Sequence, residues 1–199
     1  MSALALIAFG SNYEAKSNLV KGLKALNQQV RILAVSPVYE NPAIGEMTTP
    51  PYLNGVCLIE THWPALELHE QVLRSIENSL GRIRGESGKA QCSIDLDLVL
   101  YGKEVVSVPN LQLPAPDILR YAHVAVPLGF LVPDWIHPVT KETMAQIGNR
   151  FERQKAIFSH QVEVNVAIAA QIFSPNAIIH ETNKIDTIFG IEKSFLWRN

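Results

Sequence analysis

"CSIDLDLVLYG", residues 92–102, combines an apolar strand pattern with two acids, Asp95 and Asp97, separated by one leucine. Such a short apolar run followed by a glycine is typical of a buried β-strand and its turn. Side chains alternate faces along a strand, so we expect the odd positions to share one face: Asp95, Asp97, Val99 and Tyr101. The opposite, apolar face should then consist of Ile94, Leu96, Leu98 and Leu100.

This strand is the last of six expected elements whose order indicates the fold. Apolar runs and helical spacing upstream predict strands at 3–9, 30–39 and 52–61, and helices at 14–27 and 64–80. The order strand, helix, strand, strand, helix, strand is typical of the ferredoxin-like split βαβ arrangement. We therefore predict an α+β fold with a ferredoxin-like core, an antiparallel sheet whose helices pack on one face.

Beyond residue 102 the sequence is less regular. Residues 108–138 contain several prolines, and we expect loops with short helical pieces that wrap the core. Residues 140–158 favour a helix capped at Thr140 or nearby, and the stretch that begins at His160 alternates like a strand. No pattern assigns the last residues.

These patterns give a domain division. We assign residues 1–160 to one domain and residues 161–199 to a C-terminal extension of unknown role. A chain of this length is long enough to bury a core of its own.

The composition narrows the function classes. With 47% hydrophobic and 18% charged residues among 199, the chain is typical of a soluble globular protein and not of a disordered one. A net charge of -2 argues against partners that need a broad basic surface, namely nucleic acid and anionic membranes. Two cysteines, Cys57 and Cys92, are too few for a disulfide framework, and no apolar run reaches the roughly 20 residues of a membrane span. We expect a cytoplasmic protein and leave its oligomeric state open.

The acid pair is the clearest candidate site. Two carboxylates on one strand face have Cα atoms about 7 Å apart and raise each other's pKa if nothing neutralises them. A Mg²⁺ ion would neutralise them, because it prefers oxygen ligands and is typically held by one or two carboxylates together with water and substrate phosphates. The alternative is that Asp95 and Asp97 only face solvent, although aspartate is disfavoured within strands.

Basic residues lie just before this strand. Arg82 and Arg84 follow the expected helix end, and Lys89 lies in a glycine-containing stretch after them. Arginine matches phosphate oxygens with two parallel hydrogen bonds, so this stretch is a candidate clamp for a nucleotide triphosphate. Alternatively, the two arginines only complement the dipole at the helix end.

A second candidate region is "YENPAIGEMTTPPYLNGV", residues 39–56. Tyr52 offers a ring for stacking, and Asn54 offers both a hydrogen-bond donor and an acceptor. A flat heterocycle needs this combination. Taken alone, a tyrosine or an asparagine at the beginning of a strand more often has a structural role.

Taken together, these motifs resemble a known family. "FGSN" after the first strand, "SPVYENPAIG", "YLNGV", "IENSLGRIR" and "SIDLDLVLYG" occur in the order and at the intervals of 6-hydroxymethyl-7,8-dihydropterin pyrophosphokinase of folate biosynthesis. The resemblance extends from about Leu4 to Asp134. It implies a ferredoxin-like fold and transfer of the terminal pyrophosphoryl group of ATP to the hydroxymethyl oxygen of the dihydropterin, with release of AMP.

The resemblance also implies residue roles. Asp95 and Asp97 would be ligands of two Mg²⁺ ions, and Arg82 and Arg84 would take part in catalysis. The ATP side would be formed by Glu77, Arg82, Arg84 and Lys89. The pterin pocket would be lined by Asn41, Pro42, Tyr52 and Asn54, with His123 where the family has an aromatic residue.

The sequence departs from the family at its ATP side. Cys92 stands where the family has an arginine, and Ala115 and Asp117 replace a histidine and a second arginine. Two alternatives therefore stay open beside the pyrophosphokinase. One is a catalytically weakened homologue that binds a pterin or regulates, and the other is a pyrophosphokinase for a different pterin.

Overall fold

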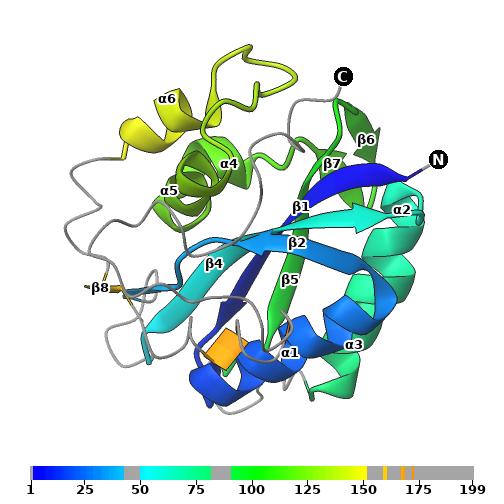
Figure 1. Ribbon diagram of the computed structural model, residues 1–199, viewed down its shortest axis with the longest axis vertical. Coiled ribbons are helices and arrows are strands. Elements are labelled where there is room, and N and C mark those ends of the chain that lie inside the picture. Colours follow the sequence, from blue (N-terminus) through cyan, green and yellow to red (C-terminus); the bar gives the residue numbers. More distant parts are fainter. Residues whose placement is uncertain are drawn as a thin grey trace.

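The computed structural model describes residues 2–42, 50–81, 91–151, 159–160, 167–168 and 172. In this part of the chain, an antiparallel sheet is centred on β1 (Ala3–Ser11), which lies between β5 (Asp95–Tyr101) and β4 (Tyr52–Thr61). β2 (Arg31–Val35) pairs with β4 on the side away from β1 (Figure 1). The spatial order β5-β1-β4-β2 is that of two interlocked split βαβ units, as predicted.

Two short strands extend this sheet. β3 (Tyr39–Asn41) pairs with the beginning of β4, and β8 (Ser159–His160) pairs with β3. The single strand expected at residues 30–39 is thus wrong, because it divides into β2 and β3. Pro37 lies in the interruption, and a proline has no N–H to give to a ladder.

The predicted crossover helices pack on one face of the sheet. α1 (Ala15–Gln29) buries Leu19, Leu23 and Leu26, in agreement with the predicted spacing. The second helical stretch has three parts: α2 (Ala65–Glu67), the π-helical η1 (Leu68–Leu73) and α3 (Arg74–Ser79). Together with β1 and β5 they enclose the larger hydrophobic core.

The π-helical turn interrupts the single helix predicted at residues 64–80, in whose regular helical spacing Leu66 falls on the apolar side with Leu73 and Leu80. Leu66 is exposed, whereas Leu68, Val72 and Leu73 are buried. A π turn contains an additional residue, so positions before it are rotated about the helix axis relative to those after it. Such insertions are frequent at functional sites.

The expectation that helices cover only one face is also wrong. α4 (Asp117–Arg120), α5 (Ala122–Leu131) and α6 (Met144–Asn149) form a second core with the other face of the sheet. α5 is apolar on nearly all sides because it lies between the sheet and α6, and such a helix shows no amphipathic period. This explains why the sequence predicted only loops with short helical pieces here. The hairpin of β6 (Val106–Val108) and β7 (Leu111–Leu113) was likewise not predicted.

The expected helix at 140–158 begins later than predicted. Thr143, not Thr140, caps α6: its hydroxyl accepts the Gln146 N–H at 3.1 Å, and the Gln146 side chain accepts the Thr143 N–H at 2.8 Å. This is a reciprocal capping box. Residues 152–158, the second half of that prediction, lie outside the described residues.

A β-bulge changes the alternation along β5. Ile7 pairs with Leu98 and Leu6 pairs with Leu100, so Val99 is the additional residue. Asp95 and Asp97 keep the predicted common face, but Leu100 joins Val99 in the second core and Tyr101 faces the helical core. The predicted faces are therefore wrong from Leu100 onward, because a bulge inverts the alternation.

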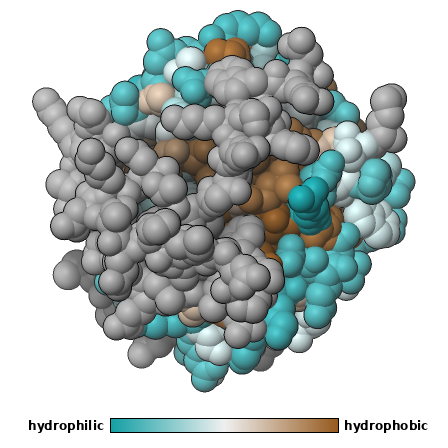
Figure 2. All heavy atoms as spheres, in the orientation of Figure 1, coloured by the Kyte–Doolittle hydropathy of each residue, from teal (hydrophilic) through white to brown (hydrophobic). Residues whose placement is uncertain are grey.

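The view of Figure 2 shows apolar residues near the middle, where the central strands lie in Figure 1, beside hydrophilic residues. None of the helices in the described ranges has the length and hydropathy that a membrane crossing requires.

Ile168, in the predicted extension, is fully buried in the helical core. The boundary at residue 160 stays a prediction.

Candidate active site

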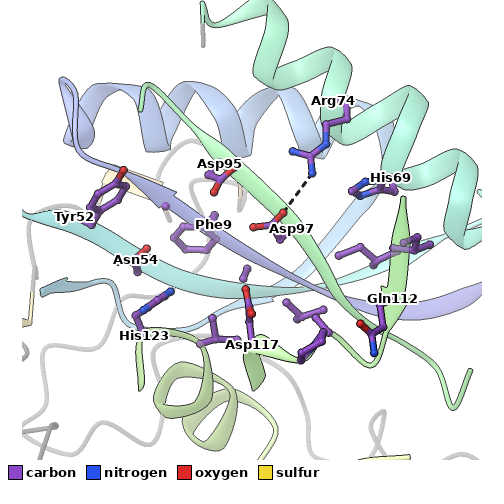
Figure 3. A pocket seen from close by; sticks show the side chains of 18 of the residues that line it. Phe9, Tyr52, Asn54, His69, Arg74, Asp95, Asp97, Gln112, Asp117 and His123 are labelled. Atoms are coloured by element: carbon purple, nitrogen blue, oxygen red, sulfur yellow. Dashed lines mark ion pairs between the residues drawn. The ribbon is translucent and has the colours of Figure 1, made fainter. Parts of the chain in front are cut away.

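A cavity of about 500 Å³ opens where the sheet meets the segment from β7 to α5 (Figure 3). The elements β1, β3, β4, η1, α3 and β5 contribute its other walls. Its polar lining side chains are Asn41, Tyr52, Asn54, His69, Arg74, Asp95, Asp97, Asn110, Gln112, Asp117 and His123. Most of the described residues that the sequence singled out therefore lie around one space.

One row of residues crosses the sheet at this cavity. Gly10 of β1 pairs with Asn54 of β4 on one side and with Asp95 of β5 on the other. Partners in an antiparallel ladder share a face, and neighbouring strands lie about 4.8 Å apart. The predicted pterin amide and the first acid are thus about 10 Å apart, with only a glycine between them.

Gly10 has a steric reason to be a glycine. A Cβ atom at this position would lie 2.5 Å from Oδ1 of Asn54. Asn54 is buried, and its Nδ2 donates to Oδ1 of Asn41, so its amide has little freedom to move away. Asn41 is opposite Tyr52 in the β3–β4 ladder, which brings these three side chains together.

The other residues of the "FGSN" stretch hold the beginning of the acid strand. Ser11 Oγ donates to the carbonyl of Ser93 at 2.7 Å, and Asn12 Oδ1 accepts the N–H of Cys92 at 2.7 Å. The Asn12 N–H in turn donates to the Cys92 carbonyl at 3.0 Å. This stretch therefore fixes where β5 begins, and with it the position of Asp95.

The two acids enter the cavity from β5, as predicted (Figure 3). Asp97 exposes 46% of its side chain, which leaves room for a ligand. Oxygen donors on one face suit a hard cation such as Mg²⁺. The described residues contain no group of three or more metal-ligating side chains, so a metal here would need phosphate or water ligands besides the aspartates.

Glu77, which the resemblance places at the ATP side, lies behind the acids and is absent from the described cavity lining. Its side chain is 1% exposed. Oε1 accepts the backbone N–H of Leu96 at 2.8 Å, and Oε2 accepts from Arg74 Nη1 at 2.6 Å. Among the described residues β5 is the last strand of the sheet on this side, so no strand there accepts the Leu96 N–H, and Glu77 accepts it instead.

Arg74 is a site residue that sequence reasoning missed. It comes from the first turn of α3, and its Nη2 lies 3.6 Å from Oδ1 of Asp97. The sequence contained one signal for it, the three-residue spacing to Glu77 on a helix.

His69 was also missed. It is buried in the π-helical η1, and no group in the described part of the chain hydrogen-bonds to its Nδ1. Burial lowers the pKa of His69, and the Arg74 cation lowers it further, while Asp97, Glu77 and Glu70 oppose this. A neutral imidazole therefore faces the cavity.

The altered β7–α5 segment forms the remaining wall. His123 stacks on Tyr121 with ring centroids 5.3 Å apart, and its side chain points into the cavity near Asn54 (Figure 3). Burial lowers the pKa of His123, against the opposing effect of Asp117. Ala115 and Asp117 line the same wall, so the family's basic side chains are absent from these two positions.

Comparison with known proteins identifies the family. The model of the 7,8-dihydro-6-hydroxymethylpterin-pyrophosphokinase (HPPK) family matches residues 6–133. The chain belongs to the HPPK family. The resemblance inferred from the motifs is thereby confirmed, with nearly the predicted limits.

Individual relatives agree with this assignment. A "2-amino-4-hydroxy-6-hydroxymethyldihydropteridine pyrophosphokinase" from Haemophilus influenzae is 31% identical over 156 residues, which are 77% of this chain and 96% of the relative. The "Folic acid synthesis protein fol1" of Schizosaccharomyces pombe is 32% identical over 86% of this chain, but the match spans only 24% of that longer protein. The prediction of a pyrophosphokinase of folate biosynthesis is confirmed at the level of the family and of these names.

A solved structure supports the fold. The Plasmodium falciparum HPPK-DHPS, crystallised with pteroate, superposes with a TM-score of 0.63 and 11% identity over 86% of this chain and 45% of that one.

Three site residues that the HPPK resemblance implies, Arg82, Arg84 and Lys89, lie outside the described residues. Pro42 lines the cavity beside Asn41.

Proposed function

We propose that this HPPK-family chain transfers the terminal pyrophosphoryl group of ATP to the hydroxymethyl oxygen of 6-hydroxymethyl-7,8-dihydropterin and acts in the cytoplasm. The observation that carries the proposal is the row Asn54, Gly10, Asp95 across three adjacent strands. Asn54, the amide proposed to bind the heterocycle, and Asp95, the acid proposed to face the phosphates, line the same cavity. The separation of about 10 Å leaves room for the hydroxymethyl group and the transferred phosphates between them.

The pterin end is formed by amides and rings. Asn41 and Asn54 are buried and hydrogen-bonded to each other, so their remaining amide atoms have fixed directions. Fixed donors and acceptors favour one flat heterocycle over others, because a mismatched ligand leaves them unsatisfied. Tyr52 and His123 would flank the ring, with His123 oriented by its stacking on Tyr121.

Asp95 and Asp97 would hold two Mg²⁺ ions together with the phosphates of ATP. Bound there, Mg²⁺ would neutralise the phosphate oxygens on which charge develops. The strand itself keeps the two carboxylates on one face, and Glu77 fixes the peptide between them. Because the two carboxylates already hold these positions, they need not rearrange during the reaction.

The reaction requires no covalent side-chain intermediate. The hydroxymethyl oxygen attacks the β-phosphorus, the bond from that phosphorus to the oxygen of the α-phosphate breaks, and AMP leaves while the hydroxyl proton is released. The protein aligns the alcohol with the phosphate. Complete burial raises the pKa of the Cys57 thiol to about 12, so this cysteine is no nucleophile.

The direct test is incubation of the protein with ATP, Mg²⁺ and the hydroxymethyl dihydropterin, followed by measurement of AMP. We expect AMP and pyrophosphorylated pterin in equal amounts. Absence of AMP above background at every Mg²⁺ concentration would refute the proposal. A different pterin as the true acceptor would appear as faster AMP release with that pterin.

The small number of basic side chains in the cavity lining supports a second candidate function. Among the described lining residues Arg74 is the sole lysine or arginine, and Asp117 adds an acid. A homologue that binds a pterin but transfers the pyrophosphoryl group to it poorly would bind the pterin in calorimetry and would bind little Mg²⁺-ATP. Tight binding of Mg²⁺-ATP would exclude this candidate.

A further inference from the structure

Arg74 occupies an unusual position in the cavity. Its guanidinium contacts two carboxylates at once, those of the buried Glu77 and of Asp97 in the cavity. Figure 3 shows the second of these contacts. The two contacts differ in kind. Nη1 donates to the buried Glu77 at 2.6 Å, whereas Nη2 lies 3.6 Å from the partly exposed Asp97.

The contact with Glu77 anchors the arginine. Glu77 is 1% exposed and is itself fixed by the Leu96 N–H, so it does not follow Arg74 if the latter moves. A charge-assisted hydrogen bond of this length to a buried carboxylate is strong. One side of the guanidinium is therefore fixed, and its Nη2 group lies toward Asp97 in the cavity.

The contact with Asp97 is replaceable. At 3.6 Å, and with 46% of the aspartate exposed, it is a weak ion pair of the kind that contributes little at a solvated surface. Asp97 is also the residue proposed to hold a metal. A cation at this place both neutralises the acid and repels an incoming divalent ion.

We propose that Arg74 is a phosphate-binding residue that serves as the counter-ion of Asp97 until Mg²⁺-ATP arrives, and then turns its Nη2 edge to the triphosphate. The inference rests on the proposed function and assigns it a further residue. It supplies a planar cation to a site at which Cys92, just before β5, stands where the family has an arginine. It also makes metal and nucleotide binding interdependent, because the nucleotide removes the cation that opposes the metal.

The proposal predicts effects of opposite sign from one substitution. Arg74→Gln removes the charge but keeps an amide that can donate to Glu77. We expect the affinity for a non-hydrolysable Mg²⁺-ATP analogue to fall about tenfold, the effect of one lost charge-assisted hydrogen bond. The affinity for Mn²⁺ alone, measured by electron paramagnetic resonance, should rise about threefold because the competing cation is gone.

Two further variants complete the experiment. Arg74→Lys keeps the charge without the planar fork, so Mn²⁺ binding should match wild type while nucleotide affinity falls several-fold. This variant also tests the proposal should Arg74→Gln fail to fold. The matched control is Arg31→Ala, which removes an arginine paired with Glu60 at 3.3 Å, remote from the described cavity lining; it should change neither affinity.

The outcomes are separable from those of the proposed function. Wild type that binds no Mg²⁺-ATP analogue refutes the function itself. Wild type that binds the analogue while Arg74→Gln binds it equally well refutes only the role of Arg74. Unchanged or weaker Mn²⁺ binding in Arg74→Gln overturns the counter-ion role.

Discussion

Glu77 accepts the backbone N–H of Leu96 at 2.8 Å, and Leu96 is the residue that separates Asp95 from Asp97. The side chain of a helix thus holds the peptide between the two predicted metal ligands. Its second oxygen holds Arg74. One buried carboxylate therefore sets the positions of an arginine and two acids relative to one another.

Replacement of Glu77 by glutamine tests this positioning role. Gln can still accept the Leu96 N–H through its Oε1, but it no longer carries the charge that holds Arg74. We expect the free energy of unfolding to fall by about 1–2 kcal/mol, since a charged hydrogen bond is lost in a buried place. The kcat for AMP formation should fall more than the KM for the pterin rises. Equal effects on both constants would indicate general loss of structure instead.

The acid pair gives the second prediction. Asp95→Asn and Asp97→Asn keep the shape of each side chain and remove the charge that would neutralise a divalent ion. We expect each variant to lose at least a hundredfold in AMP formation, about 2.7 kcal/mol of transition-state stabilisation. Thermal unfolding should stay close to wild type, and pterin binding in calorimetry should persist. Retained activity in both variants would contradict the metal assignment.

Much of this arrangement was accessible from the sequence. The alternation in "SIDLDL" placed both acids on one face, and the helical spacing of Leu19, Leu23 and Leu26 identified the helix that covers the other. These predictions hold because period and face are directly linked in a regular element. The family motifs then predicted a ligand for each end of the cavity, a pterin at one and the phosphates of ATP at the other.

The remainder depends on irregular features. The bulge at Val99 and the π turn at Leu68–Leu73 each add one residue to a regular repeat. No residue type in the sequence predicts either of them. Arg74 was missed because its importance follows from two carboxylates that the fold brings to it. The bounds of α5, in a region predicted as loops with short helical pieces, were not predicted because a helix with apolar residues on all sides has no polar face to show its period.

Gly10 gives a prediction about the pterin end. In Gly10→Ala the new methyl group would meet Oδ1 of Asn54 at 2.5 Å and displace its amide from Asn41. We expect the KM for the dihydropterin to rise about tenfold and stability to fall by about 1–3 kcal/mol, while the KM for ATP stays near wild type. A double-mutant cycle provides the control. On the background of Asn54→Ala the collision is gone, so Gly10→Ala should then have little further effect.

Acidification should destabilise the protein through three histidines, of which His69 and His137 are buried and His123 is partly buried. Burial lowers the pKa of His69, His123 and His137 from the ordinary value of 6.5, and His137 Nδ1 accepts the N–H of Thr140 at 3.1 Å, which only the neutral ring can do. Below pH 6.5 the unfolded chain therefore binds more protons than the folded one, so stability falls as pH decreases and is insensitive to these groups above that pH. His137→Asn, measured by thermal unfolding at pH 7 and pH 5, should show a smaller acid loss than wild type. His62→Asn, at an exposed position, is the matched control and should leave the loss unchanged; an equal loss in His137→Asn and wild type would contradict the role of His137.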